Sequence, residues 1–204
     1  MKKTLFTLLA LLFTLTTLAQ KEKIKITDEK QNNRLLLFAS NTSEEDLDVT
    51  LTVSGTGFRQ STRKPRAYRV PAASKVPMLS LVIERGKKPV YSYELDVTSE
   101  LSRRAIRKPA TPIKIDPDKP ILIYITENCT TCDSIVSRLD SSYYNYRKLV
   151  LAEKPEVKKT IVGAFKNTVT PYEEISNPII SLGGKLYSEI DSYEALLVAL
   201  KEEE

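Results

Sequence analysis

The two cysteines of this 204-residue chain are separated by two threonines, as Cys129-Thr130-Thr131-Cys132. This Cys-x-x-Cys spacing brings the sulfurs close enough to form a small disulfide ring, so the pair is suited to thiol–disulfide exchange. Histidine is absent, which excludes catalysis that depends on an imidazole. Two thiolates are also too few for a four-ligand metal site within one chain. We therefore expect no cofactor and no metal.

Apolar patterns on both sides of the motif indicate the elements that position it. Ile121–Ile125 is a continuous apolar, β-branched run, typical of a buried parallel strand. Helical spacing follows the motif, with one apolar face at Ile135, Val136 and Leu139. Cys129 should therefore lie at or just before a helix N-terminus, where free N–H groups and the helix dipole lower the pKa of a thiol. Cys132, one turn along and more buried, is then suited to resolve a mixed disulfide.

The rest of the second half predicts a β-α-β unit and a hairpin. Leu149–Leu151 is an expected strand, and Glu156–Phe165 is an expected helix opened by Pro155. Two further strands flank the tight turn Gly183-Gly184. The last expected element is an amphipathic helix. These three segments are Pro178–Leu182, Lys185–Tyr187 and Ser192–Lys201.

This order of elements resembles the thioredoxin fold over residues 116–204, slightly under half of the chain. The segment after Pro178, and Asn128 in place of a tryptophan before the motif, look more like glutaredoxin than thioredoxin. The resemblance implies that Cys129 is the attacking thiol and Cys132 the resolving thiol. It also implies that Pro178 is a cis-proline facing the disulfide and that the backbone of Asn177 binds a substrate strand.

In the first half, apolar residues recur with period two. Leu47–Val53 alternates apolar and polar side chains, which predicts a strand with one buried face. Further expected strands are Leu35–Phe38, Met78–Ile83 and Val90–Val97. Short strands at such intervals favour an antiparallel β-sandwich of immunoglobulin-like kind. The predicted fold class is therefore two domains: an all-β sandwich followed by an α/β thioredoxin-like fold.

Charge and proline content suggest the domain boundaries. Residues 20–108 hold 18 Lys and Arg against 11 Asp and Glu, whereas residues 109–204 hold 11 against 15. Four prolines fall between positions 109 and 120 and stiffen the chain toward an extended form. We expect a sandwich domain at 20–108, a linker at 109–118 and a thioredoxin- or glutaredoxin-like domain at 119–204.

The first nineteen residues have the layout of a secretory signal peptide. Lys2 and Lys3 precede an uncharged apolar run, and the small residue Ala19 marks the expected cleavage site. The alternative is an N-terminal membrane anchor, but the run is shorter than the roughly 20 residues of a spanning helix. With no cysteine near the cut for lipid attachment, we expect a periplasmic or secreted protein that does not span the membrane after cleavage.

Two other groups of side chains have functional and structural interpretations. Basic residues cluster at Arg59, Arg63, Lys64, Arg66 and Arg69. They suit an anion site, or a docking surface for an acidic partner such as the second half of the chain, but also a solvated loop beside a charge-protected edge strand. Export makes nucleic acid an unexpected partner. The second group is Tyr143, Tyr144 and Tyr146, which suit packing better than a substrate platform.

These observations favour an exported thiol–disulfide oxidoreductase with a sandwich module for docking or spacing. Its partners would be protein thiols or disulfides and a redox partner that the sequence does not identify. Three alternatives stay open at this point. Two of them concern the cysteine pair: a purely structural disulfide, or a metal or iron–sulfur centre shared between two chains. The third concerns the whole protein: a non-catalytic envelope binding protein with a redox-inactive scaffold.

Overall fold

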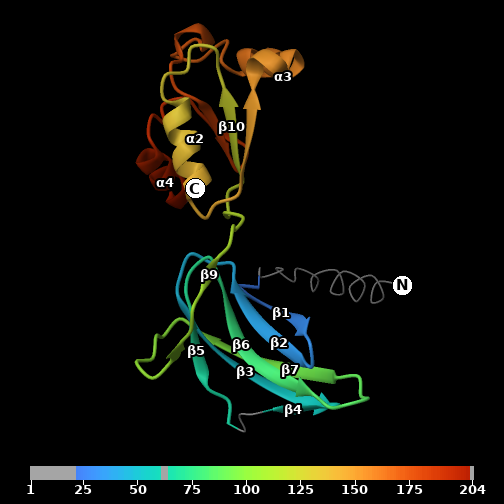
Figure 1. Ribbon diagram of the computed structural model, residues 1–204. Coiled ribbons are helices and arrows are strands. Elements are labelled where there is room, and N and C mark those ends of the chain that lie inside the picture. Colours follow the sequence, from blue (N-terminus) through green and yellow to red (C-terminus); the bar gives the residue numbers. More distant parts are fainter. Residues whose placement is uncertain (1–21, 61–63, 203–204) are drawn as a thin grey trace, which may run out of the picture.

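The computed structural model describes residues 22–60 and 64–202. These residues form two lobes joined at a narrow waist (Figure 1). The strands of residues 24–98 build the lower lobe, and all three α-helices of the described chain belong to the upper one. The predicted signal peptide lies outside the described residues. None of the described helices has the length and apolar character needed to cross a membrane.

Two sheets build the lower lobe. The first has the order β1-β2-β6-β4 with the short β9 also paired to β6, and all of its pairings are antiparallel. Its strands are β1 (Ile24–Gln31), β2 (Arg34–Asn41), β4 (Phe58–Gln60), β6 (Ser74–Ile83) and β9 (Thr111–Pro112). The second has the order β7-β3-β5-β8, with only the last pairing parallel. Its strands are β3 (Leu47–Thr56), β5 (Ala67–Val70), β7 (Val90–Thr98) and β8 (Ile106–Arg107).

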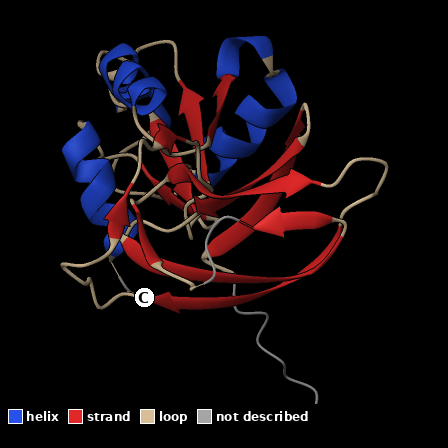
Figure 2. Ribbon diagram, turned by 60° about the horizontal axis from the view of Figure 1, so that its bottom comes forward, coloured by secondary structure: helices blue, strands red, loops and turns tan. Residues whose placement is uncertain are grey.

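One apolar core lies between these two sheets. Alternate side chains of β2 and β3 point into it, as period-two patterning requires. Its fully buried members include Leu37, Val49, Val70, Val76 and Leu81. The core therefore joins residues from both sheets, which curve around each other at one end of the molecule (Figure 2).

A third sheet, of order β11-β10-β12-β13, organises the upper lobe. Its strands are β10 (Ile121–Ile125), β11 (Tyr146–Val150), β12 (Ile179–Leu182) and β13 (Lys185–Tyr187). The last two are joined by Gly183 and Gly184, both at positive φ, as a two-residue hairpin turn demands. The helical segments are α2 (Cys132–Ser141), α3 (Pro155–Ala164), α4 (Tyr193–Lys201) and the 3-10 turns η2 (Leu151–Glu153) and η3 (Tyr172–Glu174).

The helices of this lobe pack into two separate apolar clusters. Ile135 of α2 and Leu196 of α4 share one cluster with Ile123 and Ile180. Ile161 of α3 shares the other with Ile179. Because neighbouring residues of a strand point to opposite sides of a sheet, Ile179 and Ile180 place the two clusters on opposite faces of β12.

The predicted fold class is wrong. Strands make up 42% of the described residues and helices only 20%, and the strands form three sheets; an α/β thioredoxin-like fold with a β-sandwich is not shown. The helices are short, at nine or ten residues each. Patterns around the cysteines and Pro178 determine local elements, but the fold class depends on the balance and connection of elements along the whole chain.

The segment predicted as a linker, residues 109–118, takes part in regular structure. Within it β9 pairs with β6, and Ile115 forms a bridge with Tyr144. The ammonium of Lys114 donates hydrogen bonds to the carbonyl oxygens of Asp140 and Ser142, at 2.9 and 2.5 Å. It thus satisfies carbonyls at the end of α2 that have no helical partner. The predicted domain boundaries stay a prediction.

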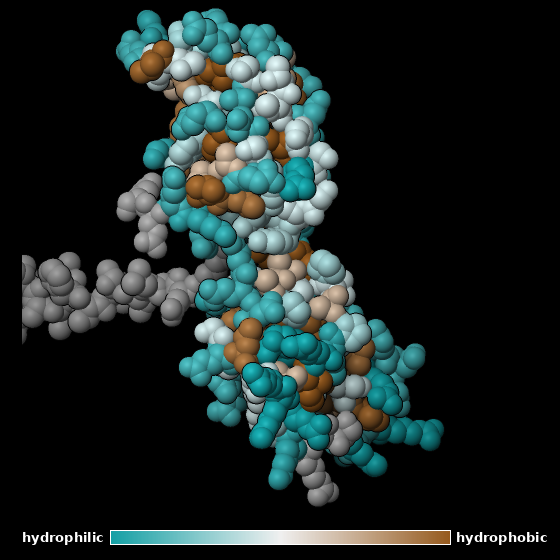
Figure 3. All heavy atoms as spheres, turned by 90° about the vertical axis from the view of Figure 1, so that its left-hand side faces the viewer, coloured by the Kyte–Doolittle hydropathy of each residue, from teal (hydrophilic) through white to brown (hydrophobic). Residues whose placement is uncertain are grey.

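A shallow groove lies at this waist. Its lining includes Ala73, Pro112, Ile113 and Tyr143, and its volume is about 430 Å³. The backbone N–H of Ile113 donates to the carbonyl of Ala73 at 2.9 Å, which extends the pairing of β9 with β6 to the waist. Figure 3 shows pale to brown surface at the waist, between largely hydrophilic lobes.

A buried ion pair ties the second sheet to the loop after β7. The side chain of Asp48 is 1% exposed and accepts hydrogen bonds from Arg69, at 2.5 Å, and from the backbone N–H of Ser102, at 2.6 Å. Burial alone would raise the pKa of Asp48, but these hydrogen bonds and the charge of Arg69 outweigh it and lower the pKa below its usual value.

We predict that Asp48→Asn lowers the free energy of unfolding at pH 7 by about 3 kcal/mol, because a buried pair loses one partner. The folded-state pKa lies below that of the unfolded chain, about 3.9, so the stabilisation is present at neutral pH and is lost as pH falls through the folded-state pKa. Urea unfolding at pH 7 and pH 3 should show the gap between wild type and variant closing at the lower pH.

Glu29→Gln, in the exposed pair with Lys75, is the matched control and should change stability little at either pH. Equal stability of Asp48→Asn and wild type at pH 7 would show that the buried pair contributes nothing.

Candidate functional site

The pairing of β10 brings the two predicted parts of the site together. β10 runs parallel to β11 and antiparallel to β12, with Tyr124 opposite Ile179. The carboxyl end of β10 and the amino end of β12 therefore meet at one edge of the sheet. The cysteine loop follows the first of these ends, and Asn177 and Pro178 precede the second.

Cys129 and Cys132 form a disulfide, with Sγ atoms 2.01 Å and Cα atoms 5.7 Å apart. α2 begins at Cys132, with Thr131 as its N-cap. Cys129 therefore lies outside the helix, three residues before its first residue, slightly earlier than the apolar spacing suggested. The disulfide nevertheless holds the sulfur of Cys129 beside the first residue of α2.

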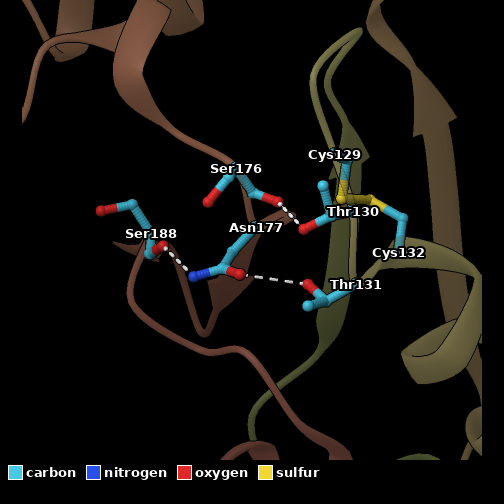
Figure 4. Close-up of a disulfide and its surroundings, with 7 residues drawn as sticks. All are labelled: Cys129, Thr130, Thr131, Cys132, Ser176, Asn177 and Ser188. Carbon is cyan, nitrogen blue, oxygen red and sulfur yellow. Dashed lines mark hydrogen bonds between the residues drawn. A yellow bond between two sulfur atoms is a disulfide. The ribbon is translucent and has the colours of Figure 1, made fainter.

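The two threonines between the cysteines bind the segment that leads into β12. Thr130 donates from its backbone N–H and its hydroxyl to the carbonyl of Ser176, at 2.8 and 3.1 Å. The hydroxyl of Thr131 donates to Oδ1 of Asn177 at 3.1 Å. Figure 4 shows the two hydroxyl bonds crossing from the disulfide loop to the neighbouring chain segment. No side-chain hydrogen bond caps the start of α2.

The side chain of Asn177 lies between the cysteine loop and the segment after β13. Its Oδ1 accepts from Thr131, and its Nδ2 lies 3.5 Å from the carbonyl oxygen of Ser188, at the outer limit of a hydrogen bond. The sequence reasoning gave Asn177 a role through its backbone. The observed contacts involve its side-chain amide.

The predicted cis bond between Asn177 and Pro178 is wrong, since no cis peptide bond occurs within residues 22–60 and 64–202. Pro178 is buried directly before β12. A trans proline fits there because the position before a strand needs no ladder N–H and accepts an extended conformation. The prediction that Asn177 and Pro178 bind a substrate strand thus loses the cis bend on which it rested.

The two sulfurs differ in access. Cys132 is 3% exposed, whereas Cys129 is partly exposed and Thr130 beside it is exposed. Solvent and other molecules can therefore approach the disulfide from the side of Cys129.

An ion pair borders the cysteine loop on the side of α3. Lys158 donates to Oε1 of Glu127 at 2.5 Å, and this hydrogen bond raises the pKa of Lys158. Burial, and then the charge of Glu127, raise the pKa of Tyr172. Nothing in the sequence spacing singled out Glu127, Lys158 or Tyr172, because they come from three elements that only the fold brings together.

Two buried hydroxyls lie in the same region without a hydrogen-bond partner among the described residues, those of Thr126 and Tyr172. Thr126 directly follows β10, and its carbonyl accepts a long bond, 3.4 Å, from the N–H of Cys129. A side-chain cluster with metal-binding composition is not found in the described part of the chain.

The other groups of interest in the sequence have structural contacts. In the basic cluster, Arg69 forms the buried pair with Asp48, and Arg59 lies 3.7 Å from Glu84; Arg63 falls outside the described residues. Among the tyrosines, Tyr144 is 1% exposed and burial is the main cause of its raised pKa. Tyr146 donates to Asp140 at 2.6 Å. These contacts agree with packing roles.

Comparison with protein-family models, with curated proteins and with solved structures finds no match to this chain. The argument about function therefore rests on the geometry of the site.

After reduction of the disulfide, we predict that Cys129 reacts with iodoacetamide at least about 10-fold faster than Cys132, because access governs alkylation and Cys132 is buried. The measurement is limited alkylation of the folded protein at pH 6 followed by peptide mass spectrometry.

The single variants Cys129→Ser and Cys132→Ser report on each remaining thiol separately, and in urea the two rates should become similar. Faster labelling of Cys132 in the folded protein would contradict the order of reactivity.

Proposed function

We propose that this protein is an exported thiol–disulfide oxidoreductase that exchanges its Cys129–Cys132 disulfide with protein thiols. One observation carries the proposal: the disulfide pairs a partly exposed cysteine, Cys129, with a buried one, Cys132, at the start of α2. An accessible sulfur can be attacked, and the buried one beside it can complete the exchange within the same chain.

In the oxidising direction, a substrate thiolate attacks the sulfur of Cys129. A bond forms between the substrate and Cys129, and the Cys129–Cys132 bond breaks, which leaves Cys132 as a thiolate. A second substrate thiolate then attacks the substrate sulfur of this mixed disulfide and releases Cys129. Two electrons pass from the substrate dithiol to the cysteine pair. The reducing direction is the reverse of these steps.

The start of α2 supports the intermediate of this exchange. The N–H groups of the first helical turn have no helical acceptor, and the helix dipole is positive at this end. Cys132 occupies the first position of α2, where both effects favour a thiolate leaving group. The chain thus supplies electrostatic stabilisation without a histidine.

The hydrogen bonds from Thr130 and Thr131 give the loop a fixed place once the disulfide opens. They hold the loop against Ser176 and Asn177 independently of the sulfur–sulfur bond. Cys129 and Cys132 therefore remain close enough to close the ring again. In this scheme Thr131 and Asn177 are positioning residues.

A purely structural role for the disulfide is less well supported. A ring closed between cysteines three positions apart removes little freedom from the unfolded chain. The loop is also already held by three hydrogen bonds to the segment before β12. The disulfide therefore adds little to the stability of a loop that these hydrogen bonds already hold.

We predict that the reduced protein reduces a peptide disulfide and that Cys129→Ser lowers this rate at least about 100-fold, because the serine hydroxyl is a weak nucleophile. Cys132→Ser should instead accumulate a mixed disulfide between Cys129 and one peptide half. Mass spectrometry without reductant detects this adduct, and circular dichroism confirms that both variants are folded.

Thr160→Ser, a conservative change on α3 away from the cysteine loop, is the matched control and should retain wild-type exchange. If the folded wild type and Cys129→Ser reduced the peptide at the same rate, the proposed function would be wrong.

A further inference from the structure

The strand β7 ends its sheet with an unpaired edge. Its nine residues pair with β3 along one side in an unbroken register, from Asp48 opposite Thr98 to Thr56 opposite Val90. On the other side, no strand of the described chain pairs with it. Seven of its nine residues are exposed. β7 therefore presents an accessible row of backbone donors and acceptors in the lower lobe (Figure 1).

This edge lacks most of the features by which edge strands are commonly protected, although it carries two carboxylates. Short length, lysine, proline and bulges discourage pairing with another chain. β7 has nine residues without lysine or proline, and its register with β3 shows no shift. The two terminal strands of the other lower sheet differ, since β4 has only three residues and β1 carries Lys25 and Lys30.

Exposed apolar side chains gather on the same strand. Val90, Tyr93 and Val97 are 64%, 48% and 38% exposed. Tyr93 lies opposite Val53 and Val97 opposite Val49, so both share the face of the sheet that covers the core. At this edge Tyr91 donates to Asp28 of β1 at 2.9 Å. The core-facing side of β7 thus carries exposed apolar side chains that an added strand would cover.

The opposite face of β7 is acidic. Glu94 and Asp96 alternate with the apolar residues, are exposed, and lie opposite the uncharged Thr52 and Thr50. Within the described residues neither carboxylate forms an ion pair. Two β7 strands paired with each other would bring these like charges together, which disfavours a second copy of the chain.

We propose that β7 binds an extended polypeptide that alternates basic and apolar side chains, as an added strand of its sheet. Backbone hydrogen bonds to β7 supply affinity. Apolar side chains of the partner cover Tyr93 and Val97, and its basic side chains lie beside Glu94 and Asp96. This surface is separate from the cysteine site, so the proposal does not depend on disulfide exchange.

The test uses the full mature chain and three labelled nine-residue peptides. One alternates lysine and valine, one alternates glutamate and valine, and the third is the lysine peptide with a central proline that blocks backbone pairing. We expect fluorescence anisotropy to show binding of the lysine peptide, with affinities at least about 10-fold weaker for the other two. Hydrogen exchange should slow at β7 only when the lysine peptide is bound.

Two variants assign the binding to β7. Tyr93→Lys places an edge lysine on the strand and should weaken binding at least about 10-fold. Glu94→Lys, on the exposed face, should shift the preference toward the glutamate peptide. Lys148→Glu, at an exposed position on the edge strand β11 of the upper lobe, is the matched control and should leave both affinities unchanged. All three variants should retain wild-type exchange with a peptide disulfide.

Several outcomes would overturn the proposal. These are absence of binding, equal binding of the lysine and glutamate peptides, or binding that neither Tyr93→Lys nor Glu94→Lys alters. Sedimentation equilibrium supplies one more: a dimer that Tyr93→Lys dissociates would show that a second copy occupies the edge.

Discussion

The antiparallel pairing of β12 with β10 is the constraint on which the cysteine site depends. It makes the end of one strand and the beginning of the other meet at a single edge, although the segments are far apart in sequence. Thr130 can contact Ser176, and Thr131 can contact Asn177, only because this register brings them together. The apolar residues of the two strands, buried in clusters on both faces, hold the register in place.

The arrangement of the loop follows from that constraint. The threonine hydroxyls donate to the neighbouring segment, the first cysteine lies outside α2 and the second begins it. Each such hydrogen bond contributes about 1 kcal/mol to stability. The three bonds together therefore hold the loop in place when the disulfide opens. Because Cys129 is partly exposed and Cys132 is buried, the proposed exchange begins at Cys129.

The sequence predicts local elements well and their combination poorly. Ile121–Ile125 is a strand with the predicted bounds, and Lys185–Tyr187 likewise, because apolar runs and glycine turns are local signals. The hydrogen bonds from Thr130 and Thr131 to residues 176 and 177 could not be predicted, because no local pattern contains both segments. The predictions of the fold class and of a cis bond before Pro178 were wrong, because both inferred tertiary geometry from a local sequence motif. Glu127 and Lys158 escaped notice for a similar reason: only the fold brings β10 and α3 together.

The reduction potential of the Cys129–Cys132 pair tests the central claim most directly. The protein is equilibrated in defined ratios of reduced and oxidised dithiothreitol or glutathione, and the oxidised fraction is measured by mass spectrometry after thiol trapping. An exchange-active pair predicts a reversible two-electron transition at a potential between about −270 and −120 mV, the range of disulfide oxidoreductases. A disulfide that stays oxidised below about −300 mV, as structural disulfides do, would contradict the proposed function.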